Sequence, residues 1–213
     1  MNITDPPYIY RILPIENLEN DLKNGFFAKN NIPNDDSRVV MANSDVIQLR
    51  DKMVVKCFKG TFVNDYVPFY FSVRTPMLYN IITGKGVIQR RQNEISYLRF
   101  RIDALAIRDF QWCYTDGNAA MNISSFYSNL KDLNKLDWRS ILTEDFRYDN
   151  ADGDTDRIRK KHSEFLVKDY VPASKINSIV VFNIVAKRKV DKILKNCNFV
   201  VNVEINPNEK YYF

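Results

Sequence analysis

Short segments rich in β-branched and aromatic residues recur along this chain without a helical pattern between each neighbouring pair. The segments typical of strands are residues 8–12, 66–73, 95–100, 111–115, 164–167, 178–183 and 199–205. Apolar residues at helical spacing are confined to residues 15–22, 76–82, 102–107, 121–130 and 186–195. A doubly wound sheet requires strands and helices to alternate regularly, so this order favours an α+β fold.

The length and composition favour one folded domain. A chain of 213 residues can bury an adequate core without disulfides or a structural metal. Its 45% hydrophobic and 27% charged residues exclude wholesale disorder. No repeat and no Pro/Gly-rich linker divides it, so we expect a single domain over residues 1–213. The net charge of +5 is compatible with a nucleic-acid partner but does not require one.

Cysteine and histidine usage argues against a metal centre. The cysteines Cys57, Cys113 and Cys197 are far apart and form no CxxC pair, so neither a zinc ribbon nor a disulfide framework is expected. The single histidine, His162, excludes a mechanism that needs two histidines. The first residues lack the basic start and apolar run of a signal peptide, and no stretch reaches the roughly 18 apolar residues of a membrane span. We therefore expect a cytoplasmic protein with no membrane contact.

Two polar stretches stand out. Residues 30–50 predict a long loop, and loops of that length are often functional. Residues 144–156 are acidic but lack the carboxylate spacing of a calcium-binding loop, so a solvated loop is expected there. The basic residues Arg157, Arg159, Lys160 and Lys161 follow at once. The phosphate-binding patterns GxGxxG and GxxxxGK[ST] and the GxSxG elbow are absent.

Two charged residues interrupt apolar segments. Arg74 ends the apolar stretch 67–73, where a buried guanidinium needs either a structural carboxylate or a phosphate as its partner. Glu164 leads into the apolar residues 165–167. A carboxylate at that position is often exposed at a sheet edge. In a cleft it would stabilise a cation or accept a proton.

Several blocks of this sequence together resemble the DarT family of DNA ADP-ribosyltransferase toxins. The blocks, in order, are YRI at 10–12 with IENL at 15–18, VPFYF at 67–71 with RTPMLY at 74–79, TDGNA at 115–119, LDW at 136–138, and KHSEFLV at 161–167. The resemblance implies an ADP-ribosyltransferase fold, in which two facing β-sheets and peripheral helices enclose an NAD-binding cleft. It also implies transfer of ADP-ribose from NAD to a guanine or thymine base of single-stranded DNA, which blocks replication.

The resemblance also assigns roles to residues. Glu164 matches the family's catalytic glutamate, and Arg74 matches an arginine implicated in catalysis. The implied NAD-binding residues are Tyr10, Arg11, Asn17, Arg50, Phe71 and Tyr79. Phe71 and Tyr79 have the alternative of packing in the core. The implied DNA-binding residues are Arg157, Arg159, Lys160, Lys161 and His162, of which His162 has packing as an alternative. No metal is implied.

Some positions depart from the family pattern and some alternatives remain. Arg11 stands where many members have histidine, and Ser163 replaces the usual alanine. The Tyr10–Arg11 form resembles a subgroup that modifies guanine rather than thymine. The resemblance implies an antitoxin partner of the macrodomain or a related type that removes the modification. The alternative functions are a related transferase acting on RNA or protein, and a non-enzymatic nucleic-acid-binding module.

Overall fold

A computed structural model describes residues 7–33, 38–41 and 43–213. Its strands are β1 (Tyr8–Pro14), β2 (Phe26–Phe27), β3 (Tyr66–Tyr70), β4 (Ile95–Arg101), β5 (Trp112–Thr115), β6 (Phe126–Tyr127), β7 (Glu164–Lys168), β8 (Tyr170–Val171), β9 (Ser178–Val181) and β10 (Asn202–Ile205). Its α-helices are α1 (Leu18–Asn24), α2 (Ser44–Lys52), α3 (Pro76–Thr83), α4 (Ile102–Leu105), α5 (Trp138–Leu142), α6 (Arg157–Lys161) and α7 (Ile184–Asn196). The predicted α+β class is confirmed.

The large sheet has eight strands in the order β10-β9-β4-β1-β3-β7-β5-β6, and β2 pairs with β8 in a separate two-stranded sheet. Neighbours are antiparallel except the pair β9–β10. Strand β1 pairs with β4 over seven residues, but with β3 only through Tyr10 and Tyr70. The large sheet therefore consists of two four-stranded halves joined at one residue pair. These halves correspond to the two sheets expected from the sequence.

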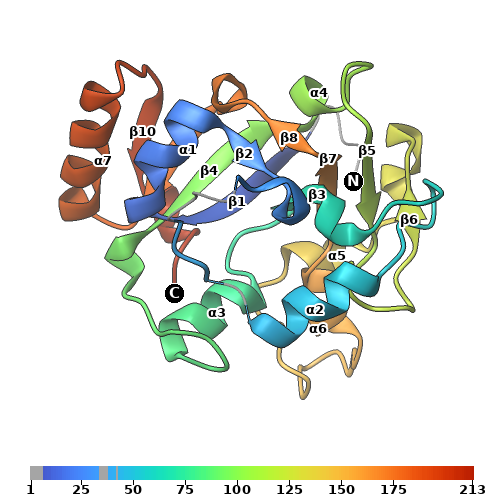
Figure 1. Ribbon diagram of the computed structural model, residues 1–213. Helices are drawn as coiled ribbons and strands as arrows, with labels where there is room; N and C mark the ends of the chain where they lie inside the picture. Colours follow the sequence, from blue (N-terminus) through green and yellow to red (C-terminus); the bar gives the residue numbers. More distant parts are fainter. Residues whose placement is uncertain (1–6, 34–37, 42) are drawn as a thin grey trace.

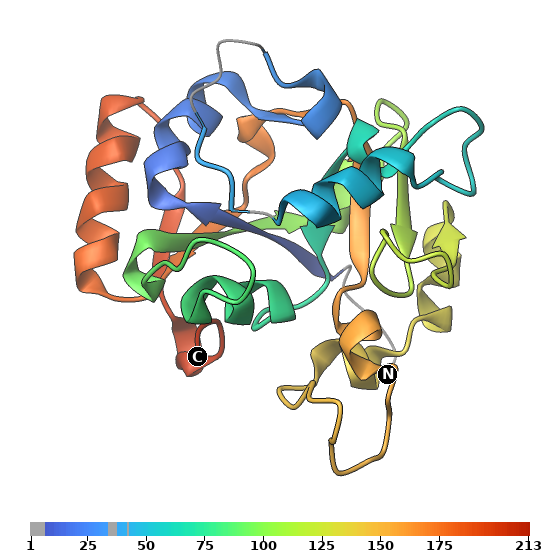
Figure 2. The same ribbon diagram turned by 60° about the horizontal axis from the view of Figure 1, so that its bottom comes forward.

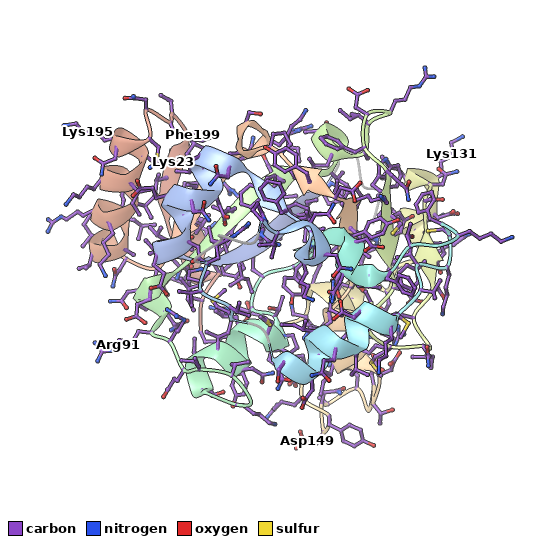
Figure 3. The ribbon with its side chains drawn as sticks, in the orientation of Figure 1. Lys23, Arg91, Lys131, Asp149, Lys195 and Phe199 are labelled. Carbon is purple, nitrogen blue, oxygen red and sulfur yellow. The ribbon has the colours of Figure 1, made fainter. Side chains whose placement is uncertain are left out.

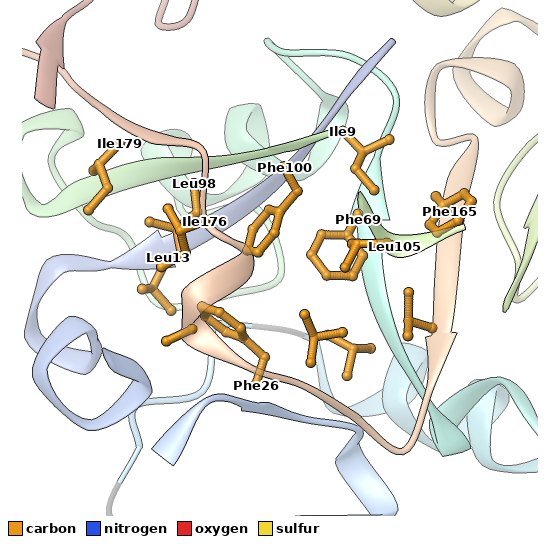
Figure 4. Close-up of a cluster of buried hydrophobic side chains, with 14 of the residues drawn as sticks. Ile9, Leu13, Phe26, Phe69, Leu98, Phe100, Leu105, Phe165, Ile176 and Ile179 are labelled. Atoms are coloured by element: carbon orange, nitrogen blue, oxygen red, sulfur yellow. The ribbon is translucent and has the colours of Figure 1, made fainter. Parts of the chain in front are cut away.

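The main hydrophobic core fills the space between the sheet and the helices on one face (Figure 4). Phe100 on β4 packs edge-on against Phe26 and Phe69, with ring centroids 5.6 and 4.8 Å apart. Helix α7 contributes Ala186, Val190 and Leu194 to this core, which are the residues of its buried face. It lies beside α1 and β10 at one end of the molecule (Figure 1). No helix among the described residues is long and apolar enough to cross a membrane.

Two predicted elements differ from the structure. Residues 44–50, expected within a loop, belong to α2. The N-terminus of α2 is capped by the Asn43 side chain, which accepts from the N–H groups of Asp45 and Val46. Helix α2 has no buried residue, so apolar spacing did not reveal it. Residues 121–130, expected to be helical, form turns and β6 instead, and Met121 and Ile123 are exposed. Part of the expected loop, residues 34–37 and 42, lies outside the described residues.

Candidate active site

Glu164 is the first residue of β7, a central strand flanked by β3 and β5. It pairs in register with Tyr70, the last residue of β3, and only 3% of its surface is exposed. Its backbone N–H donates to Thr115 Oγ1 at 3.2 Å. The residues after Glu164 are buried and apolar, which makes the strand rigid. The carboxylate therefore projects from a fixed backbone at the joint between the two halves of the sheet.

The Glu164 carboxylate is held by donors from two other segments. Arg50 on α2 donates from Nη1 to both carboxylate oxygens, at 3.0 and 2.9 Å. The backbone N–H of Ala119 donates to Oε1 at 3.1 Å. Hydrogen bonds from charged and backbone donors fix the orientation of a carboxylate. Arg50, which the resemblance implied as an NAD contact, is thus a direct hydrogen-bond partner of Glu164.

A pocket of about 230 Å³ opens beside this joint. Its lining comes mainly from β1, the turn and helix α1 that follow it, residues 38–41, β3 and the start of α3, and includes Arg11, Asn17, Arg38, Tyr70 and Met77. Asn17 Nδ2 donates to the Val39 carbonyl at 2.8 Å, and the Val39 N–H donates to Asn17 Oδ1 at 2.9 Å. These two bonds fasten residues 38–41 along the pocket. Of the residues expected to contact NAD, Arg11 and Asn17 line it.

The pocket and its surroundings carry excess positive charge and unpaired donors. The cations Arg11, Arg38 and Arg50 face two carboxylates, Asp21 and Glu164. Arg11 Nη1 donates to the Pro68 carbonyl at 3.1 Å, but Arg11 Nε and Arg50 Nη2 are buried without a hydrogen-bond partner in the described part of the chain. Burial lowers the pKa of the Arg11 guanidinium, with Arg38 and Arg50 adding to this effect and Asp21 opposing it. Buried unpaired N–H groups are costly, so a ligand with anionic oxygens fits here.

Tyr70 and His162 lie beside Glu164. Their rings are 6.3 Å apart between centroids. Burial, and then the Glu164 carboxylate, raise the pKa of the Tyr70 phenol, so Tyr70 is a hydrogen-bond donor at neutral pH. Burial lowers the pKa of His162, whose Nδ1 lies 3.0 Å from the Ile158 carbonyl oxygen. His162 therefore packs next to the site as a neutral side chain.

Arg74 has structural partners on two other segments. Its Nε donates to the Tyr212 carbonyl at 2.6 Å, Nη2 donates to the Glu209 carbonyl, and Nη1 lies 3.1 Å from Glu144 Oε2. It lies after the end of β3, in a left-handed conformation with φ 48°. Arg74 thus connects the segment between β3 and α3 to residues 209–212 and to the acidic loop. Of the two partners considered from the sequence, a structural carboxylate and a phosphate, the structure contains the carboxylate.

The aromatic residues expected to contact NAD do not line the 230 Å³ pocket. Phe71 is 2% exposed and packs edge-on against Tyr114, Trp138 and Phe165, so it belongs to the core, the alternative stated from the sequence. Tyr10 packs against Tyr97 and Tyr211. Tyr79 lies 6.1 Å from Phe146 and 5.8 Å from Phe213 between ring centroids, on the surface beside the acidic loop.

Three of the four basic residues of α6 pair with carboxylates, some in the acidic loop and some outside it, and the fourth is buried. Arg159 pairs with Asp116 and Asp156, and Lys160 pairs with Asp137 and Asp154. Arg157 pairs with Asp152 and is 4% exposed. Lys161, 2% exposed, donates to the Ile141 carbonyl at 2.9 Å.

This arrangement differs from the exposed basic face that direct binding of DNA phosphates by these residues would need. Arg157 and Lys161 are too buried for direct phosphate contact, and Arg159 and Lys160 would have to exchange a carboxylate for a phosphate. The α6 cations instead order the loop 144–156, which projects from the molecule just before Glu164 (Figure 2). Asp149 marks the outer edge of this loop (Figure 3).

Residues 115–119 are a part of the site to which the sequence assigned no role. Thr115, the last residue of β5, and Ala119, in the segment after it, both form hydrogen bonds with Glu164. Between them, a Cβ added at Gly117 would collide with the Arg159 side chain. The TDGNA block was noted only for its resemblance to the family. Its residue types did not indicate that Thr115 Oγ1 and the Ala119 N–H would form hydrogen bonds with Glu164. In the described ranges no cluster of three His, Cys, Asp or Glu residues could hold a metal ion.

Comparisons with known proteins agree with this geometry. The family model described as "ssDNA thymidine ADP-ribosyltransferase, DarT" matches residues 10–213. A "DNA ADP-ribosyl transferase" of Escherichia coli is 30% identical over 196 residues, 92% of this chain and 89% of that protein. The structure of Thermus sp. 2.9 DarT in complex with ADP-ribosylated ssDNA superposes with a TM-score of 0.87 at 30% identity, covering 98% of this chain and 97% of that one.

The same Thermus protein in complex with NAD+ gives a TM-score of 0.84 at 29% identity, with 98% of both chains covered. The match of the family model to nearly the whole chain and the likeness to an experimentally solved member lead to one conclusion: the chain belongs to the DarT family of DNA ADP-ribosyltransferases.

Proposed function

We propose that this protein transfers ADP-ribose from NAD to a nucleobase of single-stranded DNA, with Glu164 as the catalytic carboxylate. The observation that carries the proposal is the buried Glu164 carboxylate, fixed by Arg50 and the Ala119 N–H beside a cationic pocket. In the reaction, the bond between nicotinamide and ribose C1′ breaks, and nicotinamide leaves with the electron pair. A base nitrogen then donates an electron pair to C1′ and loses its proton.

The residues of the site have distinct tasks in this reaction. As nicotinamide leaves, positive charge develops on the ribose, and a preorganised carboxylate stabilises that charge without reorganisation. Arg50 and the Ala119 N–H keep Glu164 aligned. The same carboxylate is a suitable acceptor for the proton of the base. Arg11 Nε and Arg50 Nη2, both buried and unpaired within the described ranges, are donors for the anionic oxygens of NAD.

The acceptor strand would approach along the loop 144–156, which the α6 cations hold in place. Single-stranded DNA suits a buried reaction centre because its bases reach the pocket without the few-kcal/mol cost of leaving a duplex. We propose that Arg157, Arg159, Lys160 and Lys161 act on DNA through the shape of this loop. His162 packs against Tyr70 and would border the acceptor base.

Mass spectrometry of oligonucleotides tests the proposal. The protein and NAD are incubated with four single-stranded oligonucleotides, each lacking one base, beside RNA of the same sequences. We expect a mass gain of one ADP-ribose that is lost when a single base is absent. Glu164→Gln, which keeps the side-chain shape and removes the charge, should abolish the adduct while the protein stays folded. Adduct formation by Glu164→Gln at the wild-type rate would refute the assignment of Glu164.

We propose thymine as the acceptor base, because the matching family model is described by its thymidine specificity. Guanine is the second candidate, favoured by the Tyr10–Arg11 form that resembles the guanine-modifying subgroup. The four-oligonucleotide assay separates the two. An adduct only on RNA, or only on the protein itself, would instead support the related transferase with a different acceptor.

Family membership also supports a biological setting for this activity. We propose that residues 1–213 act as one ADP-ribosyltransferase domain in the cytoplasm, where the DNA substrate is found. We further propose a cognate antitoxin of the macrodomain or a related type that removes the modification. Growth arrest by the wild-type protein, relieved by co-expression of an ADP-ribosyl glycohydrolase but absent with Glu164→Gln, would support this setting. Persistent arrest despite removal of the adduct would contradict it.

A further inference from the structure

A second pocket lies on the surface where the acidic loop meets α3. It has a volume of about 500 Å³ and is lined by Tyr79, Glu144, Asp145, Phe146, Arg147 and Phe213. The three rings contact one another edge to face, with centroids 5.8 to 6.2 Å apart. Tyr79 and Phe213 are 43% and 42% exposed. Three neighbouring aromatic rings that remain partly open to solvent are unlike the sealed aromatic residues of the core.

The pocket is continuous with the segment that leads to the catalytic carboxylate. Glu144 Oε2 lies 3.1 Å from Arg74 Nη1, which fixes the start of the loop to the connection between β3 and α3. Arg157 Nη1 donates to the Asp145 carbonyl at 3.1 Å, and this joins the same residues to α6. Helix α6 ends three residues before Glu164. A group bound in the pocket is thus held on the loop past which the acceptor strand would run.

Aromatic faces and a mixed charged rim suit a nucleobase. Stacking on aromatic rings is the usual way in which proteins hold unpaired bases, because each base has a flat π-face. Glu144 is 70% exposed in its side chain, so its carboxylate can accept a hydrogen bond from an amino group of a base. Arg147 also lines the pocket, and 71% of its side chain is exposed. A backbone phosphate of the bound nucleotide would remain in solvent on this side. The carboxylates inside the pocket disfavour a phosphate there but not a base edge.

We propose that this pocket binds one unpaired base of the DNA strand, next to the acceptor nucleotide, by stacking on Tyr79 with the Phe146 ring against its edge. The base carries an exocyclic amino group, as cytosine and adenine do, which donates to Glu144. The proposal rests on the proposed function for the direction of the strand and for the position of the acceptor. It adds a determinant of sequence context that lies outside the NAD pocket.

Binding of single-stranded DNA to the full chain tests this without NAD or turnover. Short oligonucleotides carry an abasic site at each position flanking the acceptor in turn, and their affinities are measured with the wild-type protein and with Tyr79→Leu. Leucine keeps apolar packing and removes the stacking face. We expect one flanking position where the abasic site weakens binding by about 5- to 150-fold, and where Tyr79→Leu adds no further loss.

Two variants keep the result independent of folding defects. Tyr79→Phe retains the ring and should bind like the wild-type protein, while Phe146→Leu should reproduce Tyr79→Leu at the same position. With Glu144→Gln, the preference for cytosine or adenine over thymine at that position should fall by about 5-fold or more.

Other outcomes would overturn the inference. It fails if the losses from Tyr79→Leu and from the abasic site add at each flanking position, or if Tyr79→Leu binds like the wild-type protein. Failure of the proposed function would look different, because DNA would then bind with these preferences but gain no ADP-ribose.

Discussion

The pair formed by Arg50 and Glu164 makes a quantitative prediction about stability. The Arg50 and Glu164 side chains are 13% and 4% exposed, so each charge depends on the other for compensation. Removing one partner of a buried ion pair costs about 3–5 kcal/mol, because the remaining charge stays desolvated. Since Ala119 still donates to Glu164 when Arg50 is replaced, we expect about 3 kcal/mol for Arg50→Met. For a chain of this length, that corresponds to a fall of roughly 6–12 °C in Tm.

A double-mutant cycle measures the interaction itself. Urea unfolding of the wild-type protein, Arg50→Met, Glu164→Gln and the double variant gives four free energies of unfolding. The double variant leaves no unpaired charge, so its loss should be smaller than the sum of the single losses by about 2 kcal/mol. A coupling free energy below about 0.5 kcal/mol, the usual limit for independent sites, would refute the reasoning. In the ssDNA assay, Arg50→Met should lower the rate of transfer about 100-fold, because it releases the carboxylate from its position.

Three further predictions concern pH, the NAD pocket and the loop beside Glu164. Burial lowers the pKa of Lys161 to about 8. Between about pH 8 and the ordinary pKa of a lysine, the unfolded chain therefore binds more protons than the folded chain, and the free energy of unfolding should rise with pH. Lys161→Met should remove that rise in urea titrations at several pH values; an unchanged slope would show that Lys161 is not its source. Asn17→Ala removes both hydrogen bonds to Val39, which are worth about 1 kcal/mol each. It should raise the KM for NAD at least 10-fold with a smaller change in kcat. A loss confined to kcat would contradict the role of Asn17 in holding residues 38–41 along the pocket. Gly117→Ala should lower the free energy of unfolding by about 1–3 kcal/mol, because an added Cβ would meet Arg159. The same substitution should cost less when it is made in Arg159→Ala, and calorimetry of the wild-type protein, both single variants and the double variant measures the two costs. Equal costs in the two backgrounds would disprove the clash.

Much of the fold was predictable where buried residues follow a regular spacing. The strand at 95–100 and the helix at 186–195 both present apolar residues at the period of their element, and both are present in the structure as β4 and α7. Helix α2 has no buried face, so its sequence is indistinguishable from a polar loop. In the region 121–130 the apolar residues Met121 and Ile123 remain exposed, and their spacing therefore carried no information about a core.

The sequence marked Glu164, which we propose as the catalytic carboxylate, but it gave little information about the contacts around it. Arg50 is 114 residues from Glu164, and no local pattern links an exposed helix to the start of β7. Arg74 was expected to act in catalysis. Its partners include the backbone carbonyls of residues 209 and 212, and no sequence pattern connects those residues to Arg74. The α6 cations follow a run of carboxylates in the sequence, and charge complementarity alone indicates that the two groups pair.

The single residue pair that joins the two halves of the sheet has a consequence for how such an enzyme can diversify. Only Tyr10 and Tyr70 bridge β1 and β3, so the hydrogen-bond ladders of the halves are almost independent of each other. One half contains β1 and its Arg11, and the other contains β7 with the loops after β5 and before α6. Loops tolerate insertion and replacement more readily than the strands that carry them. Under the proposed function, substitutions in the loops after β5 and before α6 can therefore change the acceptor preference while β1 and Arg11 stay in place. Pro68 and Tyr70 of β3 also line the pocket proposed for NAD, so β3 has to be inherited together with β1.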